Sequence, residues 1–377
     1  MQQSTFKPKP SNYLISTPTN DKMDFPKLFT VGPVYVRDEV REEMGRQMFS
    51  HRSSDYTKLH SEVVDKLHKL MKTENEIFLY TSSATGIWES CARNCVEKSV
   101  ISCANGAFSE RFGRCMEANG KKVQFVEKPW GEAILPEDLE MALQESDAEA
   151  VTIVHNETST GVMNPLEELC AVAKEYGVLT LVDCVSSMGG APVEVDKWGI
   201  DVCLFSVQKC MAVPPGLAVA SVSEKAMEKS YSLNDRGYYF DFQVLHKYGQ
   251  KDQTPATPPV PQIFGLDKAA ELILEEGLEA VWARHKKVSD YVKMRCRDMG
   301  FSLYPDEQYA SQTLSCMNAE PRNPVELLKR MKEKGYVIGS GYGKLKETTF
   351  RVGNMGNVHM GDVEEMLDVM AQEVKGL

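Results

Sequence analysis

Short apolar runs alternate with stretches of helical periodicity between residues 77 and 206. The apolar runs occupy residues 77–80, 100–103, 123–126, 150–155, 178–183 and 202–206. The helical stretches begin near residue 86 and then cover about 107–119, 136–144 and 165–176. Strands that are buried on both faces read as continuous apolar runs, and parallel strands need long crossovers between them. The alternation therefore predicts an α/β fold, with helices on both faces of a mostly parallel sheet.

The pattern changes after residue 209. Residues 217–222 predict one more strand, and a long helix is predicted over about 264–299 with an interruption near Gly277. The last part has predicted strands near 301–304, 311–317 and 348–353, and predicted helices over 324–334 and 361–375. These elements indicate a second, smaller unit of mixed strands and helices.

We therefore predict three parts in the chain. Residues 1–25 are polar, contain three prolines and show little periodicity, so they are predicted to form a flexible extension or an arm on a partner subunit. Residues 26–275 form a large domain, whose N-terminal segment contributes to the small domain or to a dimer interface. Residues 276–377 form the small C-terminal domain.

Charge and cysteine content narrow the class of protein. The chain has 43 basic and 54 acidic residues, a net charge of −11, which argues against nonspecific binding to nucleic acid or anionic membranes. Its ten cysteines include no Cys-x-x-Cys pair, and no apolar run is long enough to span a membrane. We expect a cytoplasmic enzyme for small molecules, with no nucleic-acid partner, no membrane partner and no metal site.

Two residues in this framework carry chemistry. Asp183 ends one apolar run, and Lys209 follows another in a stretch that continues to Pro214-Pro215-Gly216. A lysine amine forms a Schiff base with an aldehyde cofactor, and a carboxylate at a strand's C-terminal end keeps a pyridine nitrogen protonated. Taken singly, both residues also fit surface positions. Together they predict a pyridoxal-phosphate enzyme with Lys209 and Asp183 as catalytic residues.

A phosphate site is predicted where the first long strand meets its helix. Residues 81–86 read Thr-Ser-Ser-Ala-Thr-Gly and offer hydroxyls and backbone N–H groups at a helix N-terminus. A plain helix cap explains the same residues. The segment is neither a Walker A sequence nor the dinucleotide-binding glycine pattern, so nucleotide binding is disfavoured.

An ordered series of short motifs resembles one enzyme family. The motifs are, in chain order, Gly32-Pro33, Ser83-Ala84-Thr85, Asn105-Gly106, His155-Asn156-Glu157-Thr158-Ser159-Thr160-Gly161, Asp183, Ser186-Ser187, Gln208-Lys209, Pro214-Pro215-Gly216 and Phe350-Arg351-Val352-Gly353. The chain is similar, from about residue 28 to its end, to class V, fold-type I pyridoxal-phosphate aminotransferases. The alanine–glyoxylate and serine–pyruvate (serine–glyoxylate) branch is the nearest. The resemblance implies a large domain with a mostly parallel seven-stranded sheet between helices, and a smaller C-terminal α+β domain.

The resemblance also implies roles for individual residues. Lys209 would hold the cofactor and move the proton at the substrate Cα, and Asp183 would pair with the pyridine nitrogen. Phe108 would stack on the ring, although without the family pattern a core aromatic on a helix is the favoured interpretation, and Thr158 would bond to the cofactor's phenolic oxygen. The phosphate would be held by Ser83, Ala84, Thr85 and Gln208, together with Thr254 and Thr257 supplied by the other subunit of a homodimer with shared active sites.

Arg351 and Tyr35 are the predicted substrate-binding residues. The guanidinium of Arg351, at the end of a short strand, would bind the α-carboxylate bidentately. Tyr35 would line the substrate side, where a plain packing role also fits. The implied reaction is transamination between a small amino acid, alanine or serine, and a 2-oxo acid, glyoxylate or pyruvate. The alternatives are cysteine desulfurase or lyase chemistry, with Cys316 as the cysteine to weigh, and an aminotransferase with aspartate as donor.

Overall fold

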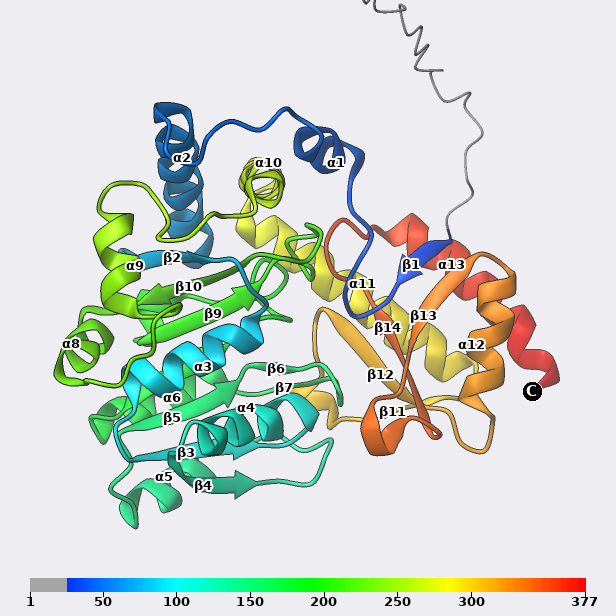
Figure 1. Cartoon of the computed structure of the whole chain (residues 1–377). Helices are drawn as coiled ribbons and strands as arrows, with labels where there is room; N and C mark the ends of the chain where they lie inside the picture. The colour runs from blue at the N-terminus through cyan, green and yellow to red at the C-terminus, as the bar shows by residue number, and fades with distance from the viewer. Residues whose placement is uncertain (1–25) are drawn as a thin grey trace, which may run out of the picture.

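The computed structural model describes residues 26–377, which contain two large β-sheets with helices packed around them and a separate two-stranded hairpin (Figure 1). The larger sheet has seven strands, in the spatial order β2 (Glu76–Tyr80), β10 (Ala218–Val222), β9 (Val202–Ser206), β8 (Leu179–Asp183), β5 (Ala150–Val154), β3 (Ser99–Ala104) and β4 (Lys122–Glu127). Only β10 runs antiparallel to its neighbours, β2 and β9. The predicted seven-stranded, mostly parallel sheet is therefore confirmed.

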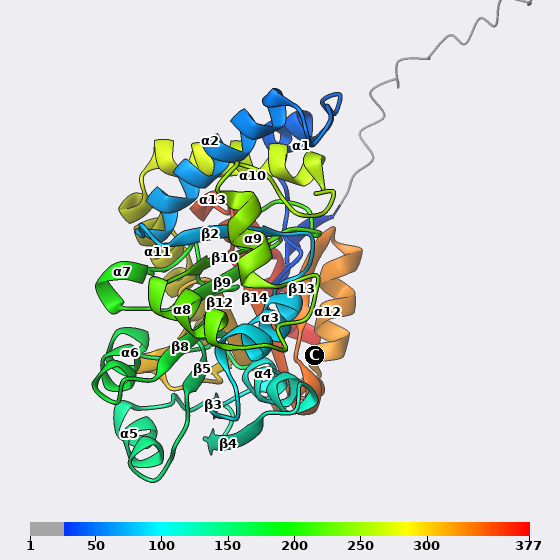
Figure 2. The same ribbon diagram turned by 60° about the vertical axis from the view of Figure 1, so that its left-hand side comes forward.

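Side-chain alternation in the strands gives this sheet two apolar faces. In β2, Ile77 and Leu79 join the core on one face, whereas Phe78 and Tyr80 join the core on the other. The first face is covered by α2 (Ser54–Met71), α5 (Pro136–Gln144), α6 (Leu166–Glu175), α7 (Val195–Trp198) and α10 (Val260–Glu276). The second is covered by α3 (Ala84–Cys95), α4 (Ala107–Ala118), α8 (Glu224–Ser232) and α9 (Phe242–Gly249) (Figure 2).

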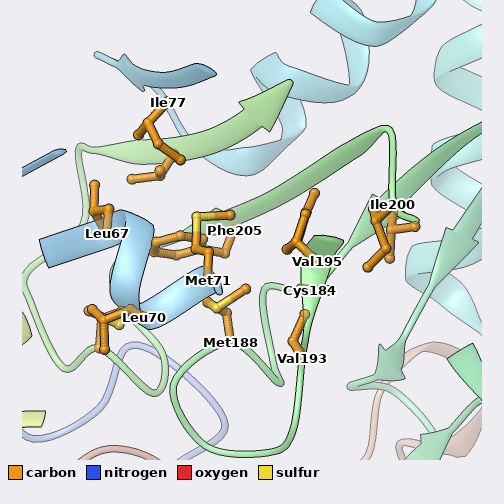
Figure 3. Close-up of a cluster of buried hydrophobic side chains, with 14 of the residues drawn as sticks. Leu67, Leu70, Met71, Ile77, Cys184, Met188, Val193, Val195, Ile200 and Phe205 are labelled. Atoms are coloured by element: carbon orange, nitrogen blue, oxygen red, sulfur yellow. The ribbon is translucent and has the colours of Figure 1, made fainter. Parts of the chain in front are cut away.

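The end of β8 shows why this arrangement creates a site. Cys184 follows the strand and lies among Met71, Met188 and Phe205 in the core beneath α2 (Figure 3). Successive side chains of an extended segment point to opposite faces, so Asp183 points toward α3 instead. The carboxylate therefore lies at the C-terminal end of the parallel strands, where ligand sites of α/β sheets form.

The smaller sheet joins the first and last parts of the described chain. Its strands are, in spatial order, β1 (Lys27–Phe29), β13 (Tyr336–Ser340), β14 (Thr349–Gly353), β12 (Leu314–Asn318) and β11 (Ser302–Leu303). Helices α11 (Leu278–Asp298), α12 (Pro324–Glu333) and α13 (Met360–Glu373) share its hydrophobic core. β1 pairs in parallel with β13, so the N-terminal segment lies against the C-terminal part (Figure 1).

Several short elements were not predicted from the sequence. These are β1, β13, α1 (Asp38–Met44), α7, α8, α9 and the hairpin β6 (Asn156–Glu157) and β7 (Val162–Met163), besides the 3₁₀ turns Glu307–Tyr309, Gly343–Leu345 and Val374–Gly376. β1 has only three residues and α1 only one buried residue, Val40, so neither shows a clear period. The interruption near Gly277 is confirmed, since α10 ends at Glu276 and α11 begins at Leu278.

The division into a large domain over 26–275 and a small one over 276–377 stays a prediction. The break at Gly277 supports it, because α10 packs in the core of the larger sheet and most of α11 packs in the core of the smaller one. The predicted extension over residues 1–25 lies outside the described residues. Within residues 26–377, no helix has both the length and the apolar character needed to cross a membrane.

Candidate active site

Lys209 is buried in the turn that follows β9. Its Nζ lies 3.4 Å from the hydroxyl of Thr158 and 5.8 Å from the centre of the Phe108 ring. Its aliphatic stem packs on Gly32, where a Cβ atom would come within 2.7 Å of Lys209 Cδ. Burial, and then the charge of Arg351, lower the pKa of Lys209 to about 8. About a tenth of this amine is therefore uncharged, and so nucleophilic, at pH 7, far more than at the ordinary lysine pKa of 10.5.

Asp183 is held by two donors at the end of β8. The indole N–H of Trp88 donates to Oδ2 at 2.8 Å, and the backbone N–H of Val185 donates to Oδ1 at 2.9 Å. Burial outweighs these two bonds and raises the pKa of Asp183 to about 7. A cationic N–H next to this carboxylate would stabilise its charged form.

Trp88 was not predicted from the sequence as a site residue. It lies on α3 four residues after Ala84 and therefore on the same helix face, which packs against the sheet. Its ring stacks on Phe112 of α4, with centroids 5.1 Å apart and planes at 16°. In the sequence, the four-residue spacing from Ala84 to Trp88 indicates that Trp88 is buried on the same helix face. It does not predict the bond to Asp183.

Thr158 lies in the turn of the β6–β7 hairpin, facing Lys209. Its hydroxyl is 2.5 Å from the hydroxyl of Ser186. The Ser186 carbonyl in turn accepts hydrogen bonds from Asn156 Nδ2 at 2.9 Å and from Thr313 Oγ1 at 2.7 Å. A residue of the C-terminal part, Thr313, thus helps to hold the loop that carries Thr158.

Arg351 reaches the same place from β14. It is buried, with Nε donating to the Ser340 carbonyl at 2.8 Å and Nη1 donating to the Thr158 carbonyl at 2.8 Å. Burial lowers the pKa of Arg351 from its usual range. These backbone bonds fix the guanidinium, and the structure gives Nη2 no hydrogen bond to any residue in 26–377, which leaves it free for a carboxylate.

Tyr342, in the loop between β13 and β14, packs beside Phe108 and Arg351. It was not predicted from the sequence as a site residue either. Its ring centre lies 5.2 Å from that of Phe108 and 5.6 Å from Arg351 Cζ. Its hydroxyl accepts a hydrogen bond from Arg111 Nη1 at 3.2 Å. An aromatic residue between Gly341 and Gly343 is a weak sequence signal for a residue presented by a loop.

The predicted phosphate residues lie at the start of α3 and beside Lys209. Ser83 is the N-cap residue of α3, is exposed, and accepts no capping hydrogen bond through its side chain. Ala84 is buried and Thr85 exposed in the first turn. Gln208 Oε1 is buried without a hydrogen-bond partner within residues 26–377. A helix N-terminus with an unused hydroxyl fits an anionic group, whereas the unpaired Oε1 of Gln208 is an acceptor and adds nothing to such a site.

Three predicted residues do not join this group through any hydrogen bond in residues 26–377. Tyr35 is 51% exposed. Thr254 is buried, donates to the Ala256 carbonyl at 2.9 Å and lines a small cavity with Thr81. Thr257 is exposed. Their predicted roles, two of which need a second subunit, stay predictions.

We refer to Lys209, Asp183, Phe108, Thr158 and Arg351 as the site cluster. It combines a buried amine, a buried carboxylate, an aromatic face, a hydroxyl and a fixed guanidinium, and it lies at the C-terminal edge of the parallel sheet. This donor set fits pyridoxal phosphate: the amine suits the aldehyde, the raised pKa of Asp183 suits a protonated ring nitrogen, and the start of α3 suits the phosphate. The fold is that of the fold-type I pyridoxal-phosphate aminotransferases.

The chain belongs to the class-V aminotransferase family, whose profile matches residues 36–347. It is 32% identical to serine–glyoxylate aminotransferase of Methylorubrum extorquens, over 90% of this chain and 87% of that protein. It is 31% identical to L-aspartate–glyoxylate aminotransferase of Paracoccus denitrificans, over 88% of this chain and 86% of that protein. Among solved structures, alanine–glyoxylate aminotransferase of Nostoc sp. superposes with a TM-score of 0.89 at 29% identity, over 98% of this chain and all of that one.

Proposed function

We propose that the protein uses pyridoxal phosphate to transfer an amino group from a small amino acid, alanine or serine, to glyoxylate or pyruvate. The single observation that carries the proposal is the site cluster, in which Lys209, Asp183 and Arg351 reach one place from three separate segments. The family membership supports transamination as the reaction type. The three relatives named above share glyoxylate in their names but differ in the amino acid, so the acceptor has broader support than the donor.

Each residue of the site cluster has a chemical task in this proposal. Bound pyridoxal phosphate supplies an electron sink for the bond that breaks at the substrate Cα. Lys209, with its pKa lowered to about 8, takes and returns the proton at that carbon. Asp183 would keep a proton on the ring nitrogen by charge pairing, and Arg351 would orient the substrate through its α-carboxylate. Phe108 would stack on the ring, and Thr158 would hold the phenolic oxygen.

Aspartate as donor is the second candidate, and Arg111 is the observation that favours it. The Arg111 guanidinium lies 5.7 Å from the centre of the Phe108 ring and donates to the Tyr342 hydroxyl. Tyr342 therefore lies between Arg351 and a second cation, which would suit a second carboxylate. Arg52, which lies in the loop before α2, is another arginine that could bind a second carboxylate, but its guanidinium donates to the backbone carbonyls of Thr254 and Pro255.

Cysteine desulfurase chemistry is disfavoured by Cys316. This residue lies within β12, is buried, and has a pKa raised to about 12 by its burial. A desulfurase needs a reactive thiolate on a mobile loop, whereas Cys316 is a neutral thiol within a sheet. The other cysteines are also free of disulfides, and all except Cys115 are buried.

The donor is identified by a half-reaction screen. Enzyme loaded with pyridoxal phosphate is mixed separately with alanine, serine and aspartate, and the visible absorbance is followed as the cofactor is converted to its amine form. We expect alanine or serine to react fastest. Arg111→Gln is the matched variant: if aspartate reacts fastest and this variant selectively loses that reaction, the second candidate replaces the first. If no amino acid converts the cofactor, transamination itself is contradicted.

We also propose a cytoplasmic homodimer in which Thr254 and Thr257 bind the partner's phosphate. The exposure of Thr257 supports this role, since the residue is accessible to a second subunit. Light scattering should give twice the chain mass of 42.2 kDa, or a multiple of it. A fully active species at 42.2 kDa would contradict the shared site.

A further inference from the structure

Glu157 is a buried carboxylate that has no task in the mechanism above. It lies in β6, one residue before Thr158, and its exposure is 0%. Its oxygens accept hydrogen bonds from the backbone N–H groups of Phe108 at 3.2 Å, Ser109 at 2.9 Å and Ser159 at 3.0 Å. They also accept from the hydroxyls of Ser109 at 3.0 Å and Ser159 at 2.6 Å. A buried carboxylate is costly unless hydrogen bonds replace its lost hydration, and these five donors provide them.

The donors show that Glu157 caps helix α4 from a different element. The N-cap residue of α4 is Gly106, which has no side chain to bond to the free N–H groups of the first turn. Glu157 takes that place, and its negative charge is stabilised at the positive end of the helix dipole. The approach is so close that a Cβ atom on Gly106 would come within 2.4 Å of Glu157 Cγ.

The same contacts connect Glu157 to both sides of the site cluster. On one side it binds the backbone N–H of Phe108, whose ring faces Lys209 Nζ. On the other side it fixes the hairpin turn through Ser159, next to Thr158, and the Thr158 carbonyl accepts from Arg351. The carboxylate therefore helps to set how far apart the aromatic ring and the hairpin turn lie, together with the Ala107 N–H, which donates to Ser159 Oγ at 3.0 Å.

We infer that Glu157 is a positioning residue, which holds the Phe108 ring and the Thr158 turn at the separation that pyridoxal phosphate requires. The inference rests on the proposed function, since the separation matters only if the cofactor ring binds between these residues. Charge and shape are both needed. A glutamine at this position would turn an amide N–H₂ toward donors on one side, leaving buried N–H groups without an acceptor.

The test measures cofactor affinity and needs no turnover. Cofactor-free protein is titrated with pyridoxal phosphate, and its dissociation constant is compared for the wild type and Glu157→Gln. We expect the variant to bind about tenfold more weakly or worse. An unchanged dissociation constant would overturn the inference.

Glu149→Gln is the matched control. The Glu149 carboxylate also accepts from successive backbone N–H groups, those of Glu97 at 2.8 Å, Lys98 at 2.6 Å and Ser99 at 3.2 Å. It lies at the other end of β3 and β5, away from the site cluster. We expect this variant to lower the unfolding midpoint while its dissociation constant stays within about twofold of the wild type. An equal loss of affinity in both variants would show a general effect of stability and would overturn the inference.

A double-mutant cycle with Phe108→Ala tests whether Glu157 acts through the ring. Once Phe108 is truncated, adding Glu157→Gln should change the dissociation constant by less than about threefold. If the double variant instead loses affinity by the product of the two single losses, Glu157 does not act through the Phe108 ring. If Glu157→Gln does not fold, the pair Ser109→Ala and Ser159→Ala removes the hydroxyl donors instead, and the same loss of affinity is expected.

Failure of the inference and failure of the proposed function give different results. If the wild type does not bind pyridoxal phosphate at all, the proposed function is wrong. If the wild type binds it and transaminates but Glu157→Gln behaves like Glu149→Gln, only the positioning role of Glu157 is wrong.

Discussion

Two lysines of this protein are buried to the same extent and have the same direction of pKa shift, yet only one has neighbours suited to chemistry. Burial lowers the pKa of both Lys209 and Lys293 to about 8. Lys293 Nζ donates to the Ser311 carbonyl at 2.7 Å and faces backbone. Lys209 faces an aromatic ring, a hydroxyl and the charge of Asp183. A perturbed pKa therefore indicates burial, and the neighbours indicate function.

This contrast makes Lys293 the control for Lys209. Lys209→Ala should abolish the visible absorbance of the bound cofactor and nearly all transamination, because the amine is the covalent anchor. Lys293→Met should keep both, although it leaves the Ser311 carbonyl without this donor and should lower the unfolding midpoint. Absorbance spectra and half-reaction rates of the two variants show which lysine anchors the cofactor. A retained band in Lys209→Ala would move the covalent link to another lysine.

Gly32 is a second residue where position and chemistry are linked. Its φ of +109° favours glycine, and a Cβ atom would meet the stem of Lys209. Gly32→Ala should displace the lysine and slow capture of pyridoxal phosphate by an order of magnitude or more, as measured by stopped-flow absorbance. Gly120→Ala is the control: φ is +77°, but nothing lies within 4 Å of the added Cβ. It should cost about 1 kcal/mol of stability and leave capture unchanged.

At the scale of elements, helix α3 serves two parts of the site at once. Its N-terminus supplies the predicted phosphate residues, and Trp88, one turn further along, donates to Asp183. The stack of Trp88 on Phe112 fixes α3 against α4, whose first turn carries Phe108. Helix packing therefore sets the distance between the start of α3 and the carboxylate.

Trp88→Phe tests this second contact of α3. The change keeps an aromatic ring on Phe112 but removes the N–H bonded to Asp183, so the carboxylate loses a donor and its pKa should rise further. We expect the half-reaction with alanine or serine to slow by roughly ten- to a hundredfold, for a lost bond to a charged group of about 1.5–3 kcal/mol. Trp198→Phe is the control, because the Trp198 indole N–H has no hydrogen-bond partner within residues 26–377. Equal rates in both variants would contradict the role of Trp88.

At the scale of the whole molecule, the site cluster makes stability depend on pH. In the cofactor-free protein, Asp183 has a folded pKa of about 7, above its usual 3.8, so the folded state retains the proton more strongly. Stability from this group is present below about pH 4 and is lost as the pH rises to about 7. Lys209 has a folded pKa of about 8, below its usual 10.5. Its contribution is present above about pH 10.5 and is lost as the pH falls to about 8.

Urea unfolding of the cofactor-free protein between pH 5 and 7 checks the contribution of Asp183 to the pH dependence of stability. The wild type should lose stability relative to Asp183→Asn as the pH rises, by at most about 1.4 kcal/mol per pH unit. The variant lacks the titrating carboxylate and so isolates its contribution. Parallel pH profiles for the two proteins would show that Asp183 titrates at an ordinary pKa.

The alternation of apolar runs and helical stretches determined the larger sheet, because strand and helix periods are local properties of the sequence. The same holds for the break at Gly277. Lys209, Asp183 and Arg351 became candidates in another way, because their neighbours along the chain resemble motifs of a known family. Helices α8 and α9 escaped prediction, since α8 buries only Ala226, Met227 and Ser230 and so has little apolar period.

The family resemblance named all five residues of the site cluster, but only the tertiary structure decided their contacts and their further neighbours Trp88, Tyr342 and Glu157. Trp88 and Asp183 are 95 positions apart, and Arg351 and Thr158 are 193 apart. The three residues of β1 form a strand only because β13 offers them a free edge. Glu157 reads as one polar residue of a hairpin until the first turn of α4 is placed against it. Such contacts depend on how far-separated segments pack, and no local period of the chain records that packing.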